Sequence, residues 1–207
     1  MCPTGTTYTD PFTTDPVASG NWLALTPANP YTWISGLVNL PQGGGATPNS
    51  QIWIGSRPNW ANYTVAVSIQ VVSGGGAGIN FRMESASTNA TNDGGMMYYI
   101  GISTAPSGVQ LGYETGGATG GNWHQATFVD TPSGSPTLVN GTTYQFVLSV
   151  SGATASVNAT VDGVAYLTNY VDPNAGGSNP APLTFGSFGL RTYLASGTYT
   201  NLFVTCN

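Results

Sequence analysis

This sequence has few charged residues, but both of its glutamates and two of its three arginines lie in short segments in which apolar and polar residues alternate. All four occupy the polar positions of those segments. Charged residues make up 5% of the chain, against about 25% in an average soluble domain. Apolar and polar residues alternate in ranges 78–84, 97–103, 108–114 and 187–193. Because neighbouring side chains of a strand point to opposite faces, the polar set should face away from the core. Its candidate site residues are Arg82, Glu84, Tyr99, Gln110, Glu114, Arg191 and Tyr193.

These residue types suit the recognition of sugars. Guanidinium and carboxylate groups make paired hydrogen bonds to adjacent hydroxyls, and aromatic rings stack on the apolar face of a sugar ring. Trp123 and His124 follow a glycine turn and could line the same surface. The alternative is that all of these are ordinary solvent-facing strand residues, where an exposed Arg–Glu pair contributes less than about 1 kcal/mol. His124 is the only histidine, which excludes a histidine-rich metal site.

The charge of the chain indicates which partners it can bind, and its cysteines indicate the cellular compartment. The net charge is -5 and three arginines cannot form a basic patch, so nucleic acid is not expected as a partner. No apolar run reaches 18 residues, so membrane insertion is not expected either. Cys2 and Cys206 stand at opposite ends of the chain and predict a disulfide, hence a secreted or cell-surface protein. Two separate thiols in frayed ends, or a lipidated Cys2, are the alternatives.

Alternation of period two, with helical patterns nearly absent, predicts an all-β protein. Residues 62–72 and 143–151 are the longest candidate strands, and Asp162-Gly163 predicts a hairpin between two neighbouring strands. Ser73-Gly74-Gly75-Gly76 is read as a turn that separates strands. Many short strands without helices predict a two-sheet antiparallel sandwich, in which residues 1–207 form a single domain.

The order of several motifs resembles the concanavalin-A-like superfamily, in its laminin-G-like bacterial jelly-roll branch. That branch includes carbohydrate-binding modules. The motifs are Asp10-Pro11-Phe12, Gly20-Asn21-Trp22, Ala77-Gly78-Ile79-Asn80-Phe81-Arg82, Met97-Tyr98-Tyr99-Ile100-Gly101-Ile102, Val161-Asp162-Gly163-Val164 and Gly189-Leu190-Arg191-Thr192-Tyr193. The resemblance implies a jelly roll that binds a glycan on the concave face of one sheet, where the candidate residues would lie.

The resemblance also implies a structural calcium ion near the chain ends. Its ligands would be Asp10 in the first strand and Asn201 in the last, where an aspartate is common in the superfamily. The carbonyl oxygen of an asparagine is acceptable to calcium. In the alternative interpretation, Asp10 opens an Asx-type turn before Pro11.

Two functions other than glycan binding stay open at this point. A glycoside hydrolase needs two carboxylates about 5–10 Å apart, and Glu84 and Glu114 are the only glutamates. The superfamily's paired-glutamate hydrolase motif is absent, whereas a polysaccharide lyase could use an arginine and a tyrosine base. A structural or adhesive surface protein, or a fibre subunit that associates through its sheet edges, is the other candidate. The sequence favours a binding domain over an enzyme.

Overall fold

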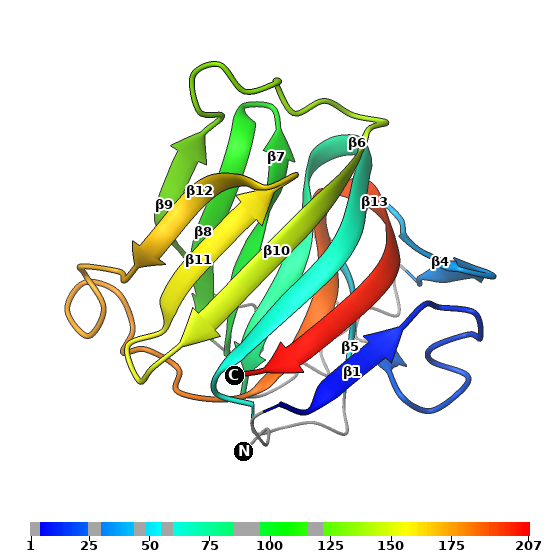
Figure 1. Ribbon diagram of the computed structural model, residues 1–207, viewed down its shortest axis with the longest axis horizontal. Helices are drawn as coiled ribbons and strands as arrows, with labels where there is room; N and C mark the ends of the chain where they lie inside the picture. The colour runs from blue at the N-terminus through cyan, green and yellow to red at the C-terminus, as the bar shows by residue number, and fades with distance from the viewer. Residues whose placement is uncertain (1–4, 25–29, 44–48, 55–59, 85–95, 116–121) are drawn as a thin grey trace.

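The computed structural model describes residues 5–24, 30–43, 49–54, 60–84, 96–115 and 122–207. Within these ranges it contains no helix, and strands make up most of the described residues (Figure 1). Every strand pairing is antiparallel, as predicted. The strands are β1 (Thr7–Asp10), β2 (Leu23–Ala24), β3 (Thr32–Ile34), β4 (Leu37–Leu40), β5 (Asn49–Trp53), β6 (Tyr63–Met83), β7 (Met97–Thr104), β8 (Ser107–Thr115), β9 (Asn122–Asp130), β10 (Thr143–Ser151), β11 (Ser156–Val161), β12 (Val164–Tyr170) and β13 (Ser187–Cys206).

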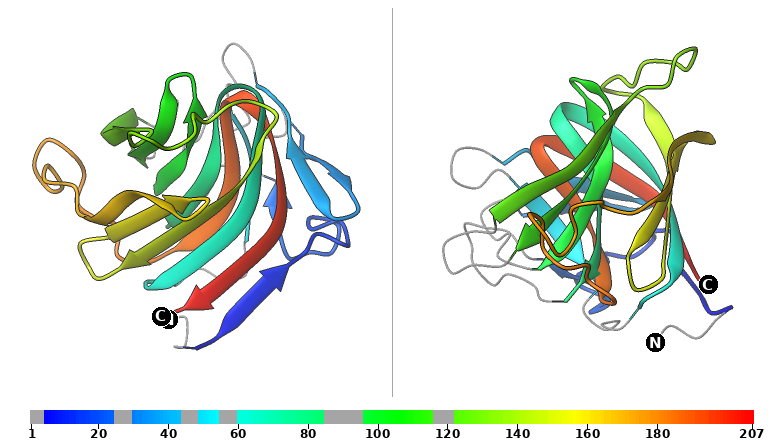
Figure 2. Two further views of the ribbon diagram at one scale, coloured as in Figure 1. Left: turned by 45° about the horizontal axis from the view of Figure 1, so that its top comes forward. Right: turned by 90° about the vertical axis from the view of Figure 1, so that its left-hand side faces the viewer.

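Two long strands, β6 and β13, run through both layers of the molecule (Figures 1 and 2). The front layer contains the first part of β6 and the last part of β13, in the order β12-β11-β10-β6-β13-β1. The back layer contains the other halves, in the order β9-β8-β7-β6-β13-β5-β2. Strand β4 pairs with β13 near its bend and with β3. The predicted two-layer arrangement is confirmed.

The glycine run after Val72 bends β6 without ending it, so the predicted turn is wrong. Gly74 has a φ of 86°, and a Cβ there would lie 2.0 Å from the carbonyl oxygen of Leu194. Only glycine tolerates both the left-handed backbone and this approach. The bend lets one strand pair with β10 on one side of the corner and with β7 on the other.

Among the described residues, one large hydrophobic cluster fills the space between the layers, and Met83 and Met97 form a small separate one. In residues 63–71, buried side chains alternate with partly exposed ones, as the sequence pattern predicts. Ile100 and Leu111 supply buried side chains from the back layer. At one end, Trp60 stacks on Phe188 with ring centroids 5.4 Å apart, and Trp22 meets the same ring edge-on. This packing fixes which face of each back-layer strand points outward.

The predicted Asp162-Gly163 hairpin joins β11 to β12. Val161 pairs with Val164 across the turn, and both central residues have positive φ. The carboxylate of Asp162 accepts a hydrogen bond of 2.7 Å from the backbone N–H of Gln145. The turn between β11 and β12 is therefore also hydrogen-bonded to β10, the neighbouring strand of the front layer.

The first and last strands lie side by side, since β1 pairs with the end of β13. The backbone N–H of Gly5 donates to the carbonyl oxygen of Cys206, and the N–H of Cys206 donates to that of Thr6, both at 2.9 Å. Cys2 lies outside the described residues, so its pairing with Cys206 stays a prediction. Among the residues described, no helix is long and apolar enough to cross a membrane.

Candidate functional site

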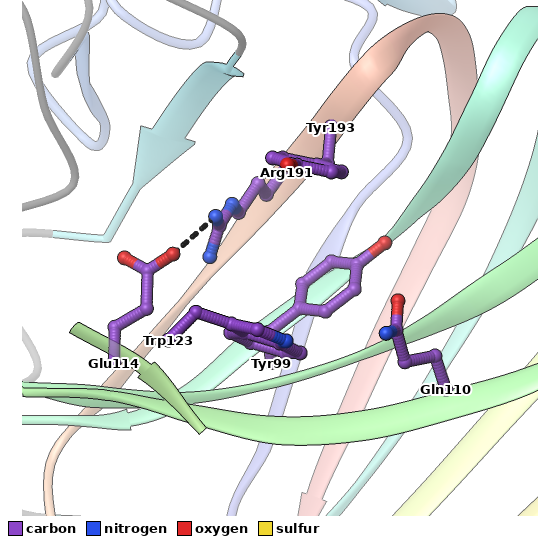
Figure 3. Close-up of a pocket in the computed structure, with 6 residues that line it drawn as sticks. All are labelled: Tyr99, Gln110, Glu114, Trp123, Arg191 and Tyr193. Carbon is purple, nitrogen blue, oxygen red and sulfur yellow. Dashed lines mark hydrogen bonds and ion pairs between the residues drawn. The ribbon is translucent and has the colours of Figure 1, made fainter. Parts of the chain in front are cut away.

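Six of the predicted site residues line one pocket on the outer face of the back layer (Figure 3). The pocket encloses about 100 Å³. Its residues come from β7, β8, β9 and β13, and we call it the ion-pair pocket. They are Tyr99, Gln110, Glu114, Trp123, Arg191 and Tyr193. Tyr98, Ile100 and Ile102 point into the core, so strand alternation directs Tyr99 to the outside.

An ion pair forms one end of this pocket. The guanidinium of Arg191 donates to Glu114 Oε1, and the two side chains are 3% and 6% exposed. Arg191 comes from β13 and Glu114 from the end of β8, so β6 and β7 lie between them in the layer. The sequence phase predicted the outward direction of both residues. It gave no sign that the two groups would meet or be buried.

Aromatic rings cover the ion pair on one side. The Arg191 guanidinium carbon lies 5.0 Å from the centroid of the Tyr99 ring, within range of a cation–π interaction. Trp123 meets Tyr99 edge-on with centroids 6.1 Å apart, and its side chain remains 37% exposed. Burial raises the pKa of the Tyr99 hydroxyl, and the Arg191 charge offsets this only in part. Tyr99 is therefore a neutral hydroxyl at physiological pH, able to donate or accept a hydrogen bond.

Glycines in the back-layer strands make room for these rings. A Cβ on Gly101 would lie 2.2 Å from the Tyr99 hydroxyl, and one on Gly112 would lie 2.4 Å from the Trp123 ring. A Cβ on Gly108 would similarly lie 2.8 Å from Phe128. A glycine within a strand commonly marks such a close approach. The outward phase of these glycines is the sequence signal that indicates a recessed surface.

A second pocket of about 440 Å³ adjoins the ion-pair pocket and shares Tyr99, Gln110 and Tyr193 with it. Gln110 Nε2 donates to Gln125 Oε1 at 3.1 Å, which joins β8 to β9 along this pocket. Phe128 forms part of the wall, and the backbone of Gly76 and Gly101 forms part of the floor. Sequence reasoning did not include Gln125 or Phe128 in the site.

Arg82 was predicted on this face, and that placement is wrong. Its side chain is fully buried and donates hydrogen bonds of 2.7 Å to the carbonyl oxygens of Ala61, Leu183 and Gly152. Between the Asn80–Gly189 and Met83–Ser187 pairs, β6 has one more residue than β13, and Arg82 has a φ of 47°. This bulge breaks the alternation on which the prediction depended.

Glu84 and His124 also lie away from the pocket lining. Glu84 follows the end of β6 and is exposed. His124 pairs with Tyr113, whose side chain belongs to the core cluster, so it faces the opposite side of β9 from Trp123. Trp123 pairs with Glu114 on the outer face. The Trp-His dipeptide therefore contributes one residue to the pocket.

Asp10 forms the Asx turn given as the alternative to calcium. Its Oδ1 accepts a hydrogen bond from the backbone N–H of Phe12 at 2.8 Å. Its Oδ2 accepts from Trp22 Nε1 at 2.8 Å and from the Tyr8 hydroxyl at 3.3 Å. Asn201 is exposed, and its neighbour Leu202 is the residue that pairs with Asp10. In the part of the chain that the structure describes, no group of three metal-binding side chains gathers, and the residues around Asp10 do not fit a calcium site.

No protein-family model and no curated protein matches the sequence. Solved structures do match. A Bacillus subtilis protein of unknown function with a galectin-like fold aligns over 100% of this chain and 98% of its own, with a TM-score of 0.68 and 15% identity. The carbohydrate-binding module CBM66 from Bacillus subtilis aligns over 89% of this chain and 95% of its own, with a TM-score of 0.63 and 13% identity. The chain has the lectin-like jelly-roll fold.

A third structure with the lectin-like jelly-roll fold is the exoplasmic/lumenal domain of VIP36, solved bound to Ca²⁺ and Man3GlcNAc. It covers 97% of this chain and 90% of its own, with a TM-score of 0.58 and 12% identity. The resemblance to the concanavalin-A-like jelly roll is thus confirmed. At such low sequence identity, these structural similarities establish only the lectin-like jelly-roll fold. The ligand has to be argued from this chain's own residues.

Proposed function

We propose that this chain is a carbohydrate-binding domain that holds a glycan in the ion-pair pocket. The observation that carries the proposal is the buried Arg191–Glu114 pair, which lines a surface pocket together with Tyr99 and the partly exposed Trp123. The binding modules and lectins among the similar structures support it. We place this face on the concave side of the jelly roll, as the superfamily resemblance implies.

The chemistry of the pocket matches that of a sugar ring. The guanidinium and carboxylate offer donors and acceptors side by side, which suits two adjacent hydroxyl groups. The partly exposed Trp123 ring offers a surface on which the C–H face of a sugar can stack. Gln110 adds an amide on the far side of Tyr99 (Figure 3). The arrangement therefore combines a few directed polar groups with an apolar wall, as small-molecule sites commonly do.

Binding is favoured over hydrolysis by the placement of the carboxylates. Among the described residues that line the pocket, Glu114 is the carboxylate, and it is engaged with Arg191. Glu84, the other glutamate, is exposed beyond the end of β6 and outside the pocket lining. A glycosidase needs an acid and a second carboxylate on either side of the scissile bond.

The proposal extends to the setting of the domain. We propose that residues 1–207 form one domain, secreted or on the cell surface, with its ends joined by a Cys2–Cys206 disulfide. The backbone pairing of Gly5 and Thr6 with Cys206 supports that pairing. A metal ion is left out of the binding proposal because Asp10 is held in an Asx turn and Leu202, rather than Asn201, lies opposite it in the strand pair.

The test is a glycan array probed with the wild-type chain, Trp123→Ala and Phe203→Ala. Phe203 is the matched control, because it is an aromatic residue of similar exposure, 43%, on the front layer. We expect the wild type and Phe203→Ala to bind the same glycans and Trp123→Ala to lose at least about tenfold in affinity, or 1.4 kcal/mol. Equal loss in both variants, or no glycan bound by the wild type, would overturn the proposal.

Size-exclusion chromatography of the same samples tests the fibre-subunit alternative. A sheet edge such as β1 can add a strand from another chain. We expect a monomer. Filaments without glycan binding would favour the structural alternative.

A further inference from the structure

The ion-pair pocket and the second pocket form one cleft. Tyr99, Gln110 and Tyr193 line both, so the two pockets meet at these residues. The cleft extends from Glu114, at the end of β8, toward Ala105 and Pro106, in the turn between β7 and β8. It therefore continues along the strands beyond the side chains that hold a sugar in the proposed function.

The second pocket carries no charge among its described lining residues. Its polar groups are the amides of Gln110 and Gln125, the hydroxyls of Ser103, Tyr99 and Tyr193, and the backbone. Phe128 supplies an aromatic wall, and its ring lies against the bare backbone of Gly108. Amides and hydroxyls beside an aromatic ring suit an uncharged, polyhydroxylated group.

The charged end of the cleft carries little net charge. The positive charge of Arg191 is compensated by Glu114, with which it forms an ion pair. The chain has a net charge of -5, which opposes the approach of a polyanion such as a sulfated glycan. Both ends of the cleft therefore favour a ligand without charge.

We propose that the ligand is a neutral oligosaccharide of at least two sugar units that lies along this cleft. One unit occupies the ion-pair pocket against Trp123, and the next occupies the second pocket against Phe128. Gln110 and Tyr193 contact the linkage between them. This inference rests on the proposed function, since it assigns the ligand class of the same site.

The test is calorimetric titration with neutral homo-oligosaccharides of one to five units, built from glucose, mannose, galactose or fructose. Heparin fragments of matched length serve as the polyanionic probe. For the series that binds, we expect the association constant to rise at least about tenfold from the monosaccharide to the di- or trisaccharide. Raising the salt from about 50 to about 500 mM should change that constant less than about twofold, because no net charge is neutralised on binding.

Two variants locate the second sugar. Phe128→Ala should remove most of the gain from chain length and leave monosaccharide affinity within about twofold, whereas Trp123→Ala should weaken both. Affinity independent of length, or a preference for heparin fragments that salt abolishes, would overturn the inference and leave glycan binding intact. No binding to any probe, neutral or charged, would overturn the proposed function together with the inference.

Discussion

Arg191 and Glu114 are 77 residues apart in the sequence, yet their side chains form an ion pair within one pocket. Arg191 comes from β13, which pairs with β6, and Glu114 comes from β8, which forms a hairpin with β7. Such a pair costs desolvation energy that a well-packed apolar pair would not. Its position on an outer sheet face, where stability does not require it, therefore supports the proposed ligand site.

The first prediction separates the contribution of the Arg191–Glu114 pair to protein stability from its role in glycan binding. Arg191→Ala leaves a buried carboxylate without its cation and should lower the free energy of unfolding by about 3–5 kcal/mol. The double variant Arg191→Met with Glu114→Leu should restore most of that stability, because it buries no lone charge. It should still fail to bind the glycan. Urea denaturation and calorimetric titration of the three proteins measure both, and a double variant that binds normally would contradict the proposed role.

Arg82 should matter for stability and not for glycan binding. Its guanidinium holds three backbone carbonyls that belong to segments far apart in the chain, at Ala61, Gly152 and Leu183. Arg82→Ala leaves these carbonyls unsatisfied and should cost roughly 3 kcal/mol or more in the free energy of unfolding. Where the variant is folded, glycan affinity should match that of the wild type. A stable Arg82→Ala protein that has lost binding would show that Arg82 acts in the site.

Stability should fall at alkaline pH because folding keeps many tyrosines protonated. Burial raises the pKa of the hydroxyls of Tyr63, Tyr98, Tyr99, Tyr113, Tyr170 and Tyr199. Burial, with the hydrogen bond to Asp15, raises the pKa of Tyr31 to about 12. The folded chain then binds more protons than the unfolded chain, whose tyrosines titrate near about 10.

Stability should therefore be complete below that unfolded pKa and decline as the pH rises through and above about 10. Urea denaturation from about pH 7 to about pH 11 measures the decline. Tyr31→Phe should reduce the slope slightly, as it removes one titrating group. A free energy of unfolding that stays constant above about pH 10 would contradict the prediction that burial raises the pKa of these tyrosine hydroxyls.

Calcium should leave the melting temperature unchanged. Both carboxylate oxygens of Asp10 accept hydrogen bonds from Phe12, Trp22 and Tyr8, and the residue across from Asp10 is Leu202 and not the other implied ligand, Asn201. Asp10→Ala should destabilise the protein with or without the metal. Thermal melts in calcium and in chelator measure this. A rise of several degrees in calcium that Asp10→Ala abolishes would establish the metal site implied by the superfamily resemblance.

Period-two alternation was enough to predict much of the structure. It predicted the strand over residues 62–72, which is the first part of β6, and the outward phase of Tyr99, Glu114 and Arg191, while the Asp162-Gly163 turn signal predicted the hairpin. These features depend on local pattern and on a buried core between two layers. The role of the pocket residues in binding a ligand stays a prediction.

Features that depend on non-local backbone geometry could not be predicted in this way. The bend at Gly74 depends on the approach of Leu194, 120 residues later, so the glycine run looked like a turn. The bulge at Arg82 depends on the register of β13 against β6, and it reversed the direction of a charged side chain. The burial of Arg191 likewise depends on which residue lies across two intervening strands.

The outer face of the back layer is the proposed glycan-binding surface. Chemical-shift mapping of the isotope-labelled protein, titrated with the best glycan from the array, tests it most directly. We expect the largest shifts at the Trp123 indole N–H, the Arg191 guanidinium and the Gln110 amide, with Phe203 unchanged. Shifts centred on the front layer around Phe203, with those three signals unmoved, would contradict it.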